Sequence, residues 1–288
     1  MKNIKILIII ISAFAFISAA YAEDMPRAYM KAQYNEWYKY YGYKDTTEVR
    51  ISTSKYILQI ADGMSYYYDP QTFKIDSLDS TPSGRAMLDE TFDKLLMDSM
   101  NGGPDPFKKR EEMGLTRGKR YRARKNFNEG KITVWDSYMA DKHRYDVDMS
   151  DLQWTPGDST KTVMGYECVN ATADYHGRKW EAWFAPELAV QDGPWQLCGL
   201  PGLIMEAHTL DGEYGFEITG IQKCDEPLKE TFETDKYFHS KRKSFLKTKS
   251  YTRKHMSEHI SAMTGGKVKP KIRRPAKEVD LIETDYNQ

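Results

Sequence analysis

The feature that most constrains the fold is an alternating stretch, residues 164–185, centred on His176-Gly177. A glycine in a two-residue turn allows the positive φ that a tight hairpin requires. Pairing outward from Tyr175 opposite Arg178 separates an apolar face from a mixed one. The apolar face receives Val169, Ala171, Ala173, Trp180, Ala182 and Phe184, and the mixed face receives Asn170, Thr172, Asp174, Lys179, Glu181 and Trp183. This pattern predicts an antiparallel sheet with one face on a core.

Two further hairpins follow the same logic. Residues 203–210 and 213–222 flank Asp211-Gly212, and residues 55–60 and 64–68 flank Asp62-Gly63. In the first of these, the apolar face carries Met205, Ala207, Thr209, Tyr214, Phe216 and Ile218. The opposite face carries Ile204, Glu206, His208, Gly215, Glu217 and Thr219. Repeated short strands with Asp-Gly or His-Gly turns indicate an antiparallel β architecture.

Helical periodicity occurs at residues 83–100, and residues 244–263 could form a second helix. Residues 28–40 suit a helix or a strand, residues 107–125 a helix or a solvated loop, and residues 154–157 a turn. We therefore expect a mainly β (α+β) fold. Its centre is a curved antiparallel β-sheet or half-barrel with one or two covering helices and a basic C-terminal extension.

The N-terminus has the pattern of a targeting segment. Lys2 and Lys5 precede an apolar run over residues 6–20, and a small-x-small site ends at Ala22. This pattern predicts a secretory signal peptide over residues 1–22, cleaved after Ala22. We expect the mature protein in the periplasm or at the cell surface, with no later transmembrane span.

The remaining chain divides into two predicted regions. Residues 23–235 form the β-rich domain, and residues 236–288 form a basic, helical or flexible C-terminal region. The three cysteines, Cys168, Cys198 and Cys224, are an odd number. An exported chain of this kind has one disulfide and one free thiol, or no disulfide.

The segment between two of the hairpins carries the most distinctive motif, Gly193-Pro-Trp195 followed by Gly199-Leu-Pro-Gly-Leu-Ile204. The second part resembles the signature of the GLPGLI family, exported Bacteroidetes proteins of unknown function. Upstream, Met164-Gly-Tyr-Glu-Cys168 and His176-Gly-Arg-Lys-Trp-Glu-Ala-Trp183 resemble that family's Gly-Tyr-x-Cys and Gly-Arg-x-Trp-x-Ala-Trp. The clear resemblance covers residues 154–222. It implies an exported β-rich protein and no particular reaction.

The motif also has a physical interpretation. Pro201 fixes φ, so the Leu200–Leu203 segment suits a type II turn with Gly202 at positive φ, while Gly199 allows close backbone packing. We interpret the motif as a buried corner that launches the next hairpin, and a ligand-facing loop is the alternative. The candidate ligand or motif residues are Trp195, Gly199, Leu200, Pro201, Gly202, Leu203 and Ile204.

A second candidate site lies on the polar face of the 203–222 hairpin. Glu206 is expected directly opposite Glu217, with His208 next on the same face. Two carboxylates and an imidazole could hold a divalent metal or share a proton. A basic side chain from a neighbouring strand would instead neutralise the pair. The alternative function is therefore a metal-binding protein or a metal-dependent hydrolase that uses this face.

The chain has 42 basic and 42 acidic residues, so its formal net charge of zero argues against nucleic-acid binding. The charge is unevenly spread, because Lys236–Arg274 carries a net charge of +12. This segment is either a solvated helix with a tail or a patch for an anionic surface. We find no nucleophile motif and expect no cofactor. The chain is best interpreted as a non-enzymatic binding or assembly module, with an envelope protein, a peptide or a lipid as partner.

Overall fold

The computed structural model describes residues 26–41, 47–139, 141–232, 234–266 and 279–287. The predicted signal peptide lies outside these residues. Within them, no helix combines the length and the apolar character that crossing a bilayer requires.

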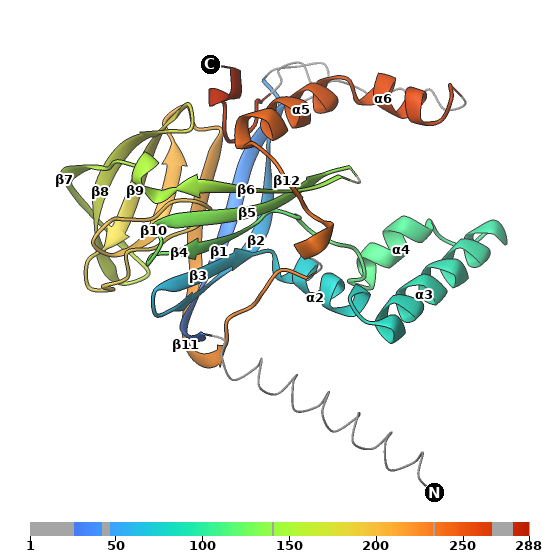
Figure 1. Cartoon of the computed structure of the whole chain (residues 1–288), viewed down its shortest axis with the longest axis horizontal. Coiled ribbons are helices and arrows are strands. Elements are labelled where there is room, and N and C mark those ends of the chain that lie inside the picture. The colour runs from blue at the N-terminus through green and yellow to red at the C-terminus, as the bar shows by residue number, and fades with distance from the viewer. Residues whose placement is uncertain (1–25, 42–46, 140, 233, 267–278, 288) are drawn as a thin grey trace, which may run out of the picture.

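The described chain builds one open, curved sheet in the order β12-β6-β5-β4-β3-β2-β1-β11-β10-β9-β8-β7 (Figure 1). All neighbouring strands are antiparallel except β12 and β6. The strands are β1 Arg27–Tyr41, β2 Val49–Ala61, β3 Met64–Tyr68, β4 Arg122–Asn126, β5 Lys131–Tyr138, β6 Asp141–Asp148, β7 Thr155–Val163, β8 Tyr166–Tyr175, β9 Arg178–Ala185, β10 Leu203–Thr209, β11 Tyr214–Pro227 and β12 Phe238–His239. The expected fold class is confirmed.

The hairpin registers agree with the expected pairing. Tyr175 lies opposite Arg178 in β8–β9, and Val169 lies opposite Phe184 at the far end. In β10–β11, Glu206 lies opposite Glu217. Both His176 and Gly177 have positive φ, as a tight two-residue turn requires. The predicted turn at residues 154–157 is wrong, because β7 begins at Thr155 and pairs with β8 there, with a register shift between Pro156 and Thr160.

The described residues also form five α-helices: α2 Pro70–Asp79, α3 Pro82–Met100, α4 Pro106–Glu112, α5 Arg242–Lys254 and α6 Met256–Met263. Each of the first three begins with proline after a capping residue, Asp69, Thr81 or Asp105. Such residues accept a hydrogen bond from a first-turn amide and so fix where the helix starts. The helix expected over 83–100 is α3. Residues 107–125 contribute to α4 and β4, and residues 28–40 lie in the strand β1. Helix α2 was not predicted from the sequence. Short 3₁₀ turns occur at Met149–Asp151, Thr234–Lys236 and Asp285–Asn287.

The main core lies on the inner face of the curved sheet. Its buried side chains come from every strand from β1 through β11 as one connected cluster. Twelve strands laid flat would span roughly 50 Å, so such a cluster requires strong curvature. The buried residues Phe245, Leu246, Val279, Leu281 and Tyr286 belong to the same core. Helix α5 and residues 279–286 are therefore packed on the sheet, whereas α6 has no buried residue and projects away from it (Figure 1).

A smaller cluster lies on the outer face. It joins Trp135, Tyr66, Tyr68 and Leu228, with Phe73 of α2 packed against it. Helix α2 thus covers the outer face, while α5 covers one end of the inner face and α3 and α4 project away from the sheet (Figure 1). This division leaves one end of the inner face bordered by α5 and by the loop that follows α4.

Candidate functional site

Residues 192–204, which we call the inner loop, fill much of the space inside the curved sheet. Trp195, Leu197 and Leu200 are almost fully buried within the main core. The loop is fixed by Lys125 of β4, whose Nζ lies 2.5 Å from Asp192 Oδ1 and donates to the carbonyls of Gly193 and Leu197 at 2.6 and 3.1 Å. Lys125 and Asp192 are both buried. A buried charge is tolerated when it is paired and hydrogen-bonded, so this ion pair anchors the loop.

The two motif glycines have roles opposite to those expected. Gly199 has φ +90°, whereas Gly202 is not among the residues with positive φ, so the predicted type II turn is wrong. A Cβ at Gly202 would lie 2.3 Å from the carbonyl oxygen of Ala185, whereas a Cβ at Gly199 would meet open space. Gly202 thus permits close packing against the end of β9. The motif's apolar residues Leu200, Leu203 and Ile204 are buried, and Gly199 and Pro201 are exposed.

Trp195 is the unusual residue of the inner loop. Its φ is +55°, a conformation that costs a bulky residue of order 1–3 kcal/mol. Its ring lies 5.4 Å from Trp180 and 6.3 Å from Phe216, measured between ring centroids. Its buried Nε1 has no hydrogen-bond partner among the residues that the structure describes. Trp195 also lines a cavity.

That cavity, which we call the end pocket, has a volume of about 360 Å³ and opens at one end of the inner face. Its walls come from the sheet, the 118–121 loop, Trp195, α5 and the C-terminal segment. The sheet contributes Glu36, Tyr38, Tyr56, Asp136, Ser137 and Tyr214, and the helix and C-terminal segment contribute Leu246, Lys249, Arg253, Leu281, Ile282 and Glu283. Volumes of this size are typical of sites for small molecules.

Glu36 is the chemically distinctive group of the end pocket. Its carboxylate makes no hydrogen bond or ion pair with any residue that the structure describes. Burial raises the pKa of Glu36 to about 7, and Asp136 and Asp69 raise it further, against the opposing charges of Lys119 and Lys249. The side chain retains partial access to the pocket. A carboxyl group without a partner can donate or accept a hydrogen bond from a ligand near neutral pH.

The other carboxylates of the end pocket are already paired. Lys249 Nζ lies 2.5 Å from Asp136 Oδ2. Arg242 Nη1 lies 2.6 Å from Glu283 Oε2. Arg253 donates to the carbonyl of Val279. The two ion pairs neutralise Lys249 and Arg242, whereas Arg253 keeps its charge because its printed partner is a backbone carbonyl. Glu36, Lys119 and Arg120 have no ion pair among the described residues.

Aromatic rings form much of the remaining wall. Tyr38 stacks on Tyr214 with ring centroids 5.9 Å apart, and Lys119 Nζ lies 5.1 Å from the Tyr38 centroid. Tyr56 stacks on Tyr67 at 4.5 Å. The Oγ atom of Ser137 is buried without a hydrogen-bond partner in the described chain. Flat apolar surfaces beside unused polar atoms can hold a ligand that is partly apolar and rich in hydrogen-bonding groups.

The predicted Glu206–His208–Glu217 face does not form a metal-ligand cluster in the described structure. Glu206 and Glu217 are opposite, as expected, but Lys161 of β7 pairs with Glu206. His208 Nε2 lies 3.4 Å from Glu181 instead. Among the described residues, the group whose possible ligand atoms all lie within 4.8 Å of one another is His176, Glu283 and Asp285. A basic neighbour therefore neutralises Glu206.

The His176 cluster is an internal ion-pair network. Arg242 binds both Glu283 and Asp285, so a guanidinium already supplies the positive charge there. Burial, helped by Arg242, lowers the pKa of His176 to about 4, so this histidine is neutral at physiological pH. The network joins the β8–β9 turn, α5 and the C-terminal segment, and its role is structural.

The cysteines are all free thiols. Burial raises the pKa of Cys198 to about 11 and also raises the pKa of Cys168. A buried thiol with a raised pKa is a poor nucleophile. Of the two alternatives for the cysteines, the structure has the one without a disulfide.

Sequence reasoning missed the end pocket. One signal was available, because β1 alternates and places Glu36 on the same face as the buried Ala32 and Tyr34. A carboxylate on an apolar face is a candidate functional group. The alternation of β1 does not show which other acidic residues line the pocket, because Asp136 and Glu283 are distant from Glu36 in sequence.

A family model described as "Protein of unknown function (Porph_ging)", associated with Bacteroidetes, matches residues 175–206. This stretch includes β9 and the whole inner loop, and the name of the family does not confirm the GLPGLI assignment. No curated protein matches the chain.

Two solved structures are distantly similar. They are titled "Structure of PNGF-II in P21 space group" and "Structure of PNGF-II in C2 space group", with TM-scores of 0.45 and 0.46 and identities of 11% and 12%. Each match covers 76% of this chain and 32% of the other chain. This chain therefore spans about a third of those proteins, and a similarity this low supports no functional inference.

Proposed function

We propose that this protein is an exported, non-enzymatic binding module and that the end pocket is its ligand site. The observation that carries the proposal is the carboxyl group of Glu36, which faces a cavity of about 360 Å³ without a described partner. Glu36 is half-buried, and a carboxyl group with a raised pKa that faces a cavity is a candidate functional group. The unused Nε1 of Trp195 and Oγ of Ser137 support the same interpretation.

The scaffold suits binding more than catalysis. The pocket walls are held by the inner loop, by the Lys249–Asp136 pair and by the Arg242–Glu283 pair. Rigid walls lower the entropic cost of binding a ligand. The free thiols have raised pKa values and are not activated for nucleophilic attack.

The predicted anionic-surface contact remains part of the proposal in a narrower form. Three basic residues of α5, Arg242, Lys249 and Arg253, are used inside the fold. Lys243 and Lys247 of α5 are exposed. These exposed lysines, with the basic residues of the segment to 274, are the groups that would face an anionic envelope surface.

Native mass spectrometry of protein purified from its own envelope tests the binding proposal. Wild type should retain a small-molecule mass, and Ser137→Phe, which fills the end pocket, should lose it. Ser150→Phe is the control, because Ser150 is exposed on the Met149–Asp151 turn. Thermal unfolding of all three proteins checks folding. A wild type without bound mass, or a folded Ser137→Phe variant with the same mass, would contradict the proposal.

A further inference from the structure

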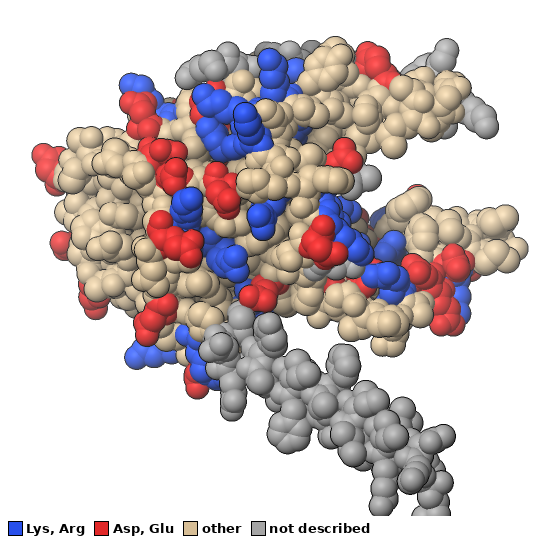
Figure 2. Space-filling view, viewed as in Figure 1, with Lys and Arg blue, Asp and Glu red and all other residues tan. Residues whose placement is uncertain are grey.

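One short loop borders three hollows of the surface. Arg120 lines the end pocket, a hollow of about 580 Å³ beside α4, and a smaller one of about 160 Å³ beside Tyr237. Figure 2 shows an indentation between the α6 and α3–α4 regions, with Lys and Arg side chains gathered at its inner end. We call residues 116–120 the clamp loop.

The clamp loop is fixed by the N-terminal part of α2. The Asp69 carboxylate accepts from the Lys119 backbone N–H at 2.9 Å while it also caps α2. Gln71 Nε2 donates to the carbonyls of Gly114 and Thr116 at 2.6 and 3.1 Å. A Cβ at Gly118 would lie 2.3 Å from Asp69 Oδ2, so the close approach requires glycine. The loop is therefore held in place before any ligand arrives.

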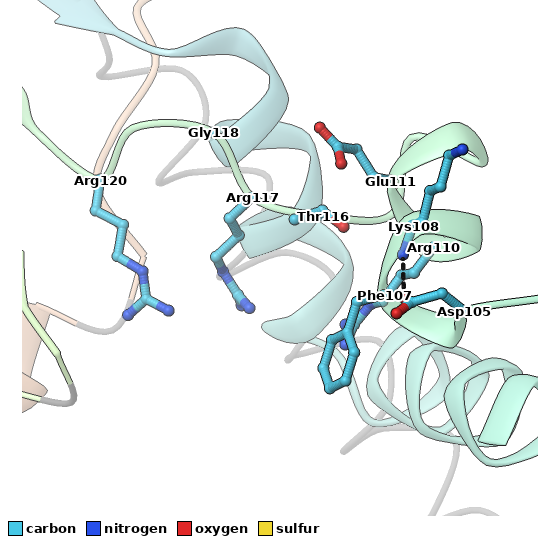
Figure 3. Close-up of a pocket in the computed structure, with 9 residues that line it drawn as sticks. All are labelled: Asp105, Phe107, Lys108, Arg110, Glu111, Thr116, Arg117, Gly118 and Arg120. Carbon is cyan, nitrogen blue, oxygen red and sulfur yellow. Dashed lines mark hydrogen bonds between the residues drawn. The ribbon is translucent and has the colours of Figure 1, made fainter. Parts of the chain in front are cut away.

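Two of the three arginines near the loop form ion pairs with described residues, and the third does not. Arg117 lies 2.6 Å from both Asp76 and Asp79, and Arg122 lies 2.6 Å from Asp76. The Arg120 guanidinium is exposed and makes no ion pair or hydrogen bond with the described residues. In Figure 3 the Arg117 and Arg120 side chains extend to the same side of the loop. Arg117 holds the loop, and Arg120 remains for a ligand.

We propose that Arg120, assisted by Lys119, binds a carboxylate or phosphate group of a ligand whose remaining part occupies the end pocket. A guanidinium fork matches both oxyanions and forms two parallel hydrogen bonds with either. The proposal places the anionic group on the clamp-loop side, beside Arg120 and Lys119, and a hydrogen-bond donor of the ligand opposite Glu36. The inference rests on the proposed function and adds the ligand class, an acidic molecule that also carries hydroxyl or amide donors.

Matched pairs of small probes test the inference by ligand-observed NMR titration of the full-length mature protein. The pairs are glucuronate with glucose, N-acetylglutamate with N-acetylglutamine, and glycerol 3-phosphate with glycerol. Loss of one charge-assisted hydrogen bond costs about 1.5–3 kcal/mol. We therefore expect at least one acidic probe to bind about tenfold or more tightly than its neutral partner. Arg120→Gln should remove that preference.

Lys108→Gln is the matched control, because Lys108 is exposed beside the same hollow as Arg120 but does not line the end pocket. It should leave the preference unchanged. Comparison of the two carboxylate probe pairs with the phosphate probe pair shows which of the two anionic groups the pocket prefers. Equal binding of both members of every pair, or an unchanged preference in Arg120→Gln, would overturn the inference while leaving the end pocket as a binding site. Failure of every probe to bind would also overturn it, and the mass retained by protein from the native envelope decides the proposed function separately.

Discussion

Gly199 and Gly202 lie in the same short motif, but the fold uses each for a different physical reason. Gly199 supplies a positive φ at an exposed position, and Gly202 supplies the absence of a side chain beside Ala185. The sequence pattern predicted a buried motif, which holds for its apolar residues but not for Gly199 and Pro201, and it interchanged the roles of the two glycines. The close contact of Gly202 is with Ala185 at the end of β9. Residue preferences for turns within the motif cannot predict a contact with another strand.

Alanine substitution should separate these roles. Gly202→Ala places a Cβ 2.3 Å from the Ala185 carbonyl oxygen and should cost about 2–3 kcal/mol through overpacking. Gly199→Ala meets open space and should cost about 1 kcal/mol through its backbone conformation. Urea unfolding measures both values. A larger loss for Gly199→Ala would contradict the assignment.

Glu36 should make stability depend on pH in a defined direction. Its pKa is raised from 4.5 to about 7 in the folded protein, so between these values the folded state binds more protons than the unfolded state. The free energy of unfolding therefore falls as pH rises through this window. Glu36→Gln should remove about 1–3 kcal/mol of that fall between pH 5 and pH 8.

The control for this measurement is Glu129→Gln, at an exposed glutamate. It should leave the pH dependence as it is in wild type. Chemical unfolding at the two pH values supplies the data. If the free energy of unfolding changes equally between the two pH values in Glu36→Gln and in wild type, the carboxyl group of Glu36 does not have the raised pKa described above.

At the scale of elements, the inner loop fills the interior of the curved sheet, and Lys125 holds it in position. Alternation and turn residues predicted the registers of β8–β9 and β10–β11 because those pairings are local in sequence. They could not predict that Lys125 of β4 would hold the loop, because this ion pair joins distant segments. The same limit explains why the end pocket, built from both ends of the chain, had no signature in any single segment.

Breaking the Lys125–Asp192 pair should destabilise the whole fold. Lys125→Met leaves a buried carboxylate and two backbone carbonyls without their donor, which should cost about 3–5 kcal/mol. Lys125→Met combined with Asp192→Asn removes the orphaned charge and should recover part of the loss. Equilibrium denaturation of the single and double variants tests this. A loss below about 1 kcal/mol for Lys125→Met would show that the loop is held by packing alone.

At the scale of the whole molecule, the uneven charge has a structural cause. The net charge of +12 over Lys236–Arg274 suggested a surface for an anionic partner, but part of it neutralises carboxylates inside the fold. Lys249 pairs with Asp136, and Arg242 pairs with Glu283 and Asp285. Asp136 belongs to β5, whereas Glu283 and Asp285 belong to the C-terminal region, so the basic segment is neutralised partly by the sheet and partly within its own region. An unused basic group at the end pocket, Arg120, comes from a different region.

Export is a prediction from residues 1–22 and has a direct test. The mature protein should begin at Glu23, because cleavage is expected after Ala22. Intact-mass measurement and N-terminal sequencing of the envelope protein check this. An uncleaved N-terminus, or recovery of the protein in the cytoplasm alone, would contradict the prediction.

The most direct test of the central claim is a crystal structure of protein purified from its native envelope without denaturation. The account predicts density for a small molecule in the end pocket, with polar atoms within about 3.5 Å of the Glu36 carboxyl group and of Trp195 Nε1. An end pocket that contains solvent alone, with ligand density elsewhere on the protein, would contradict the claim.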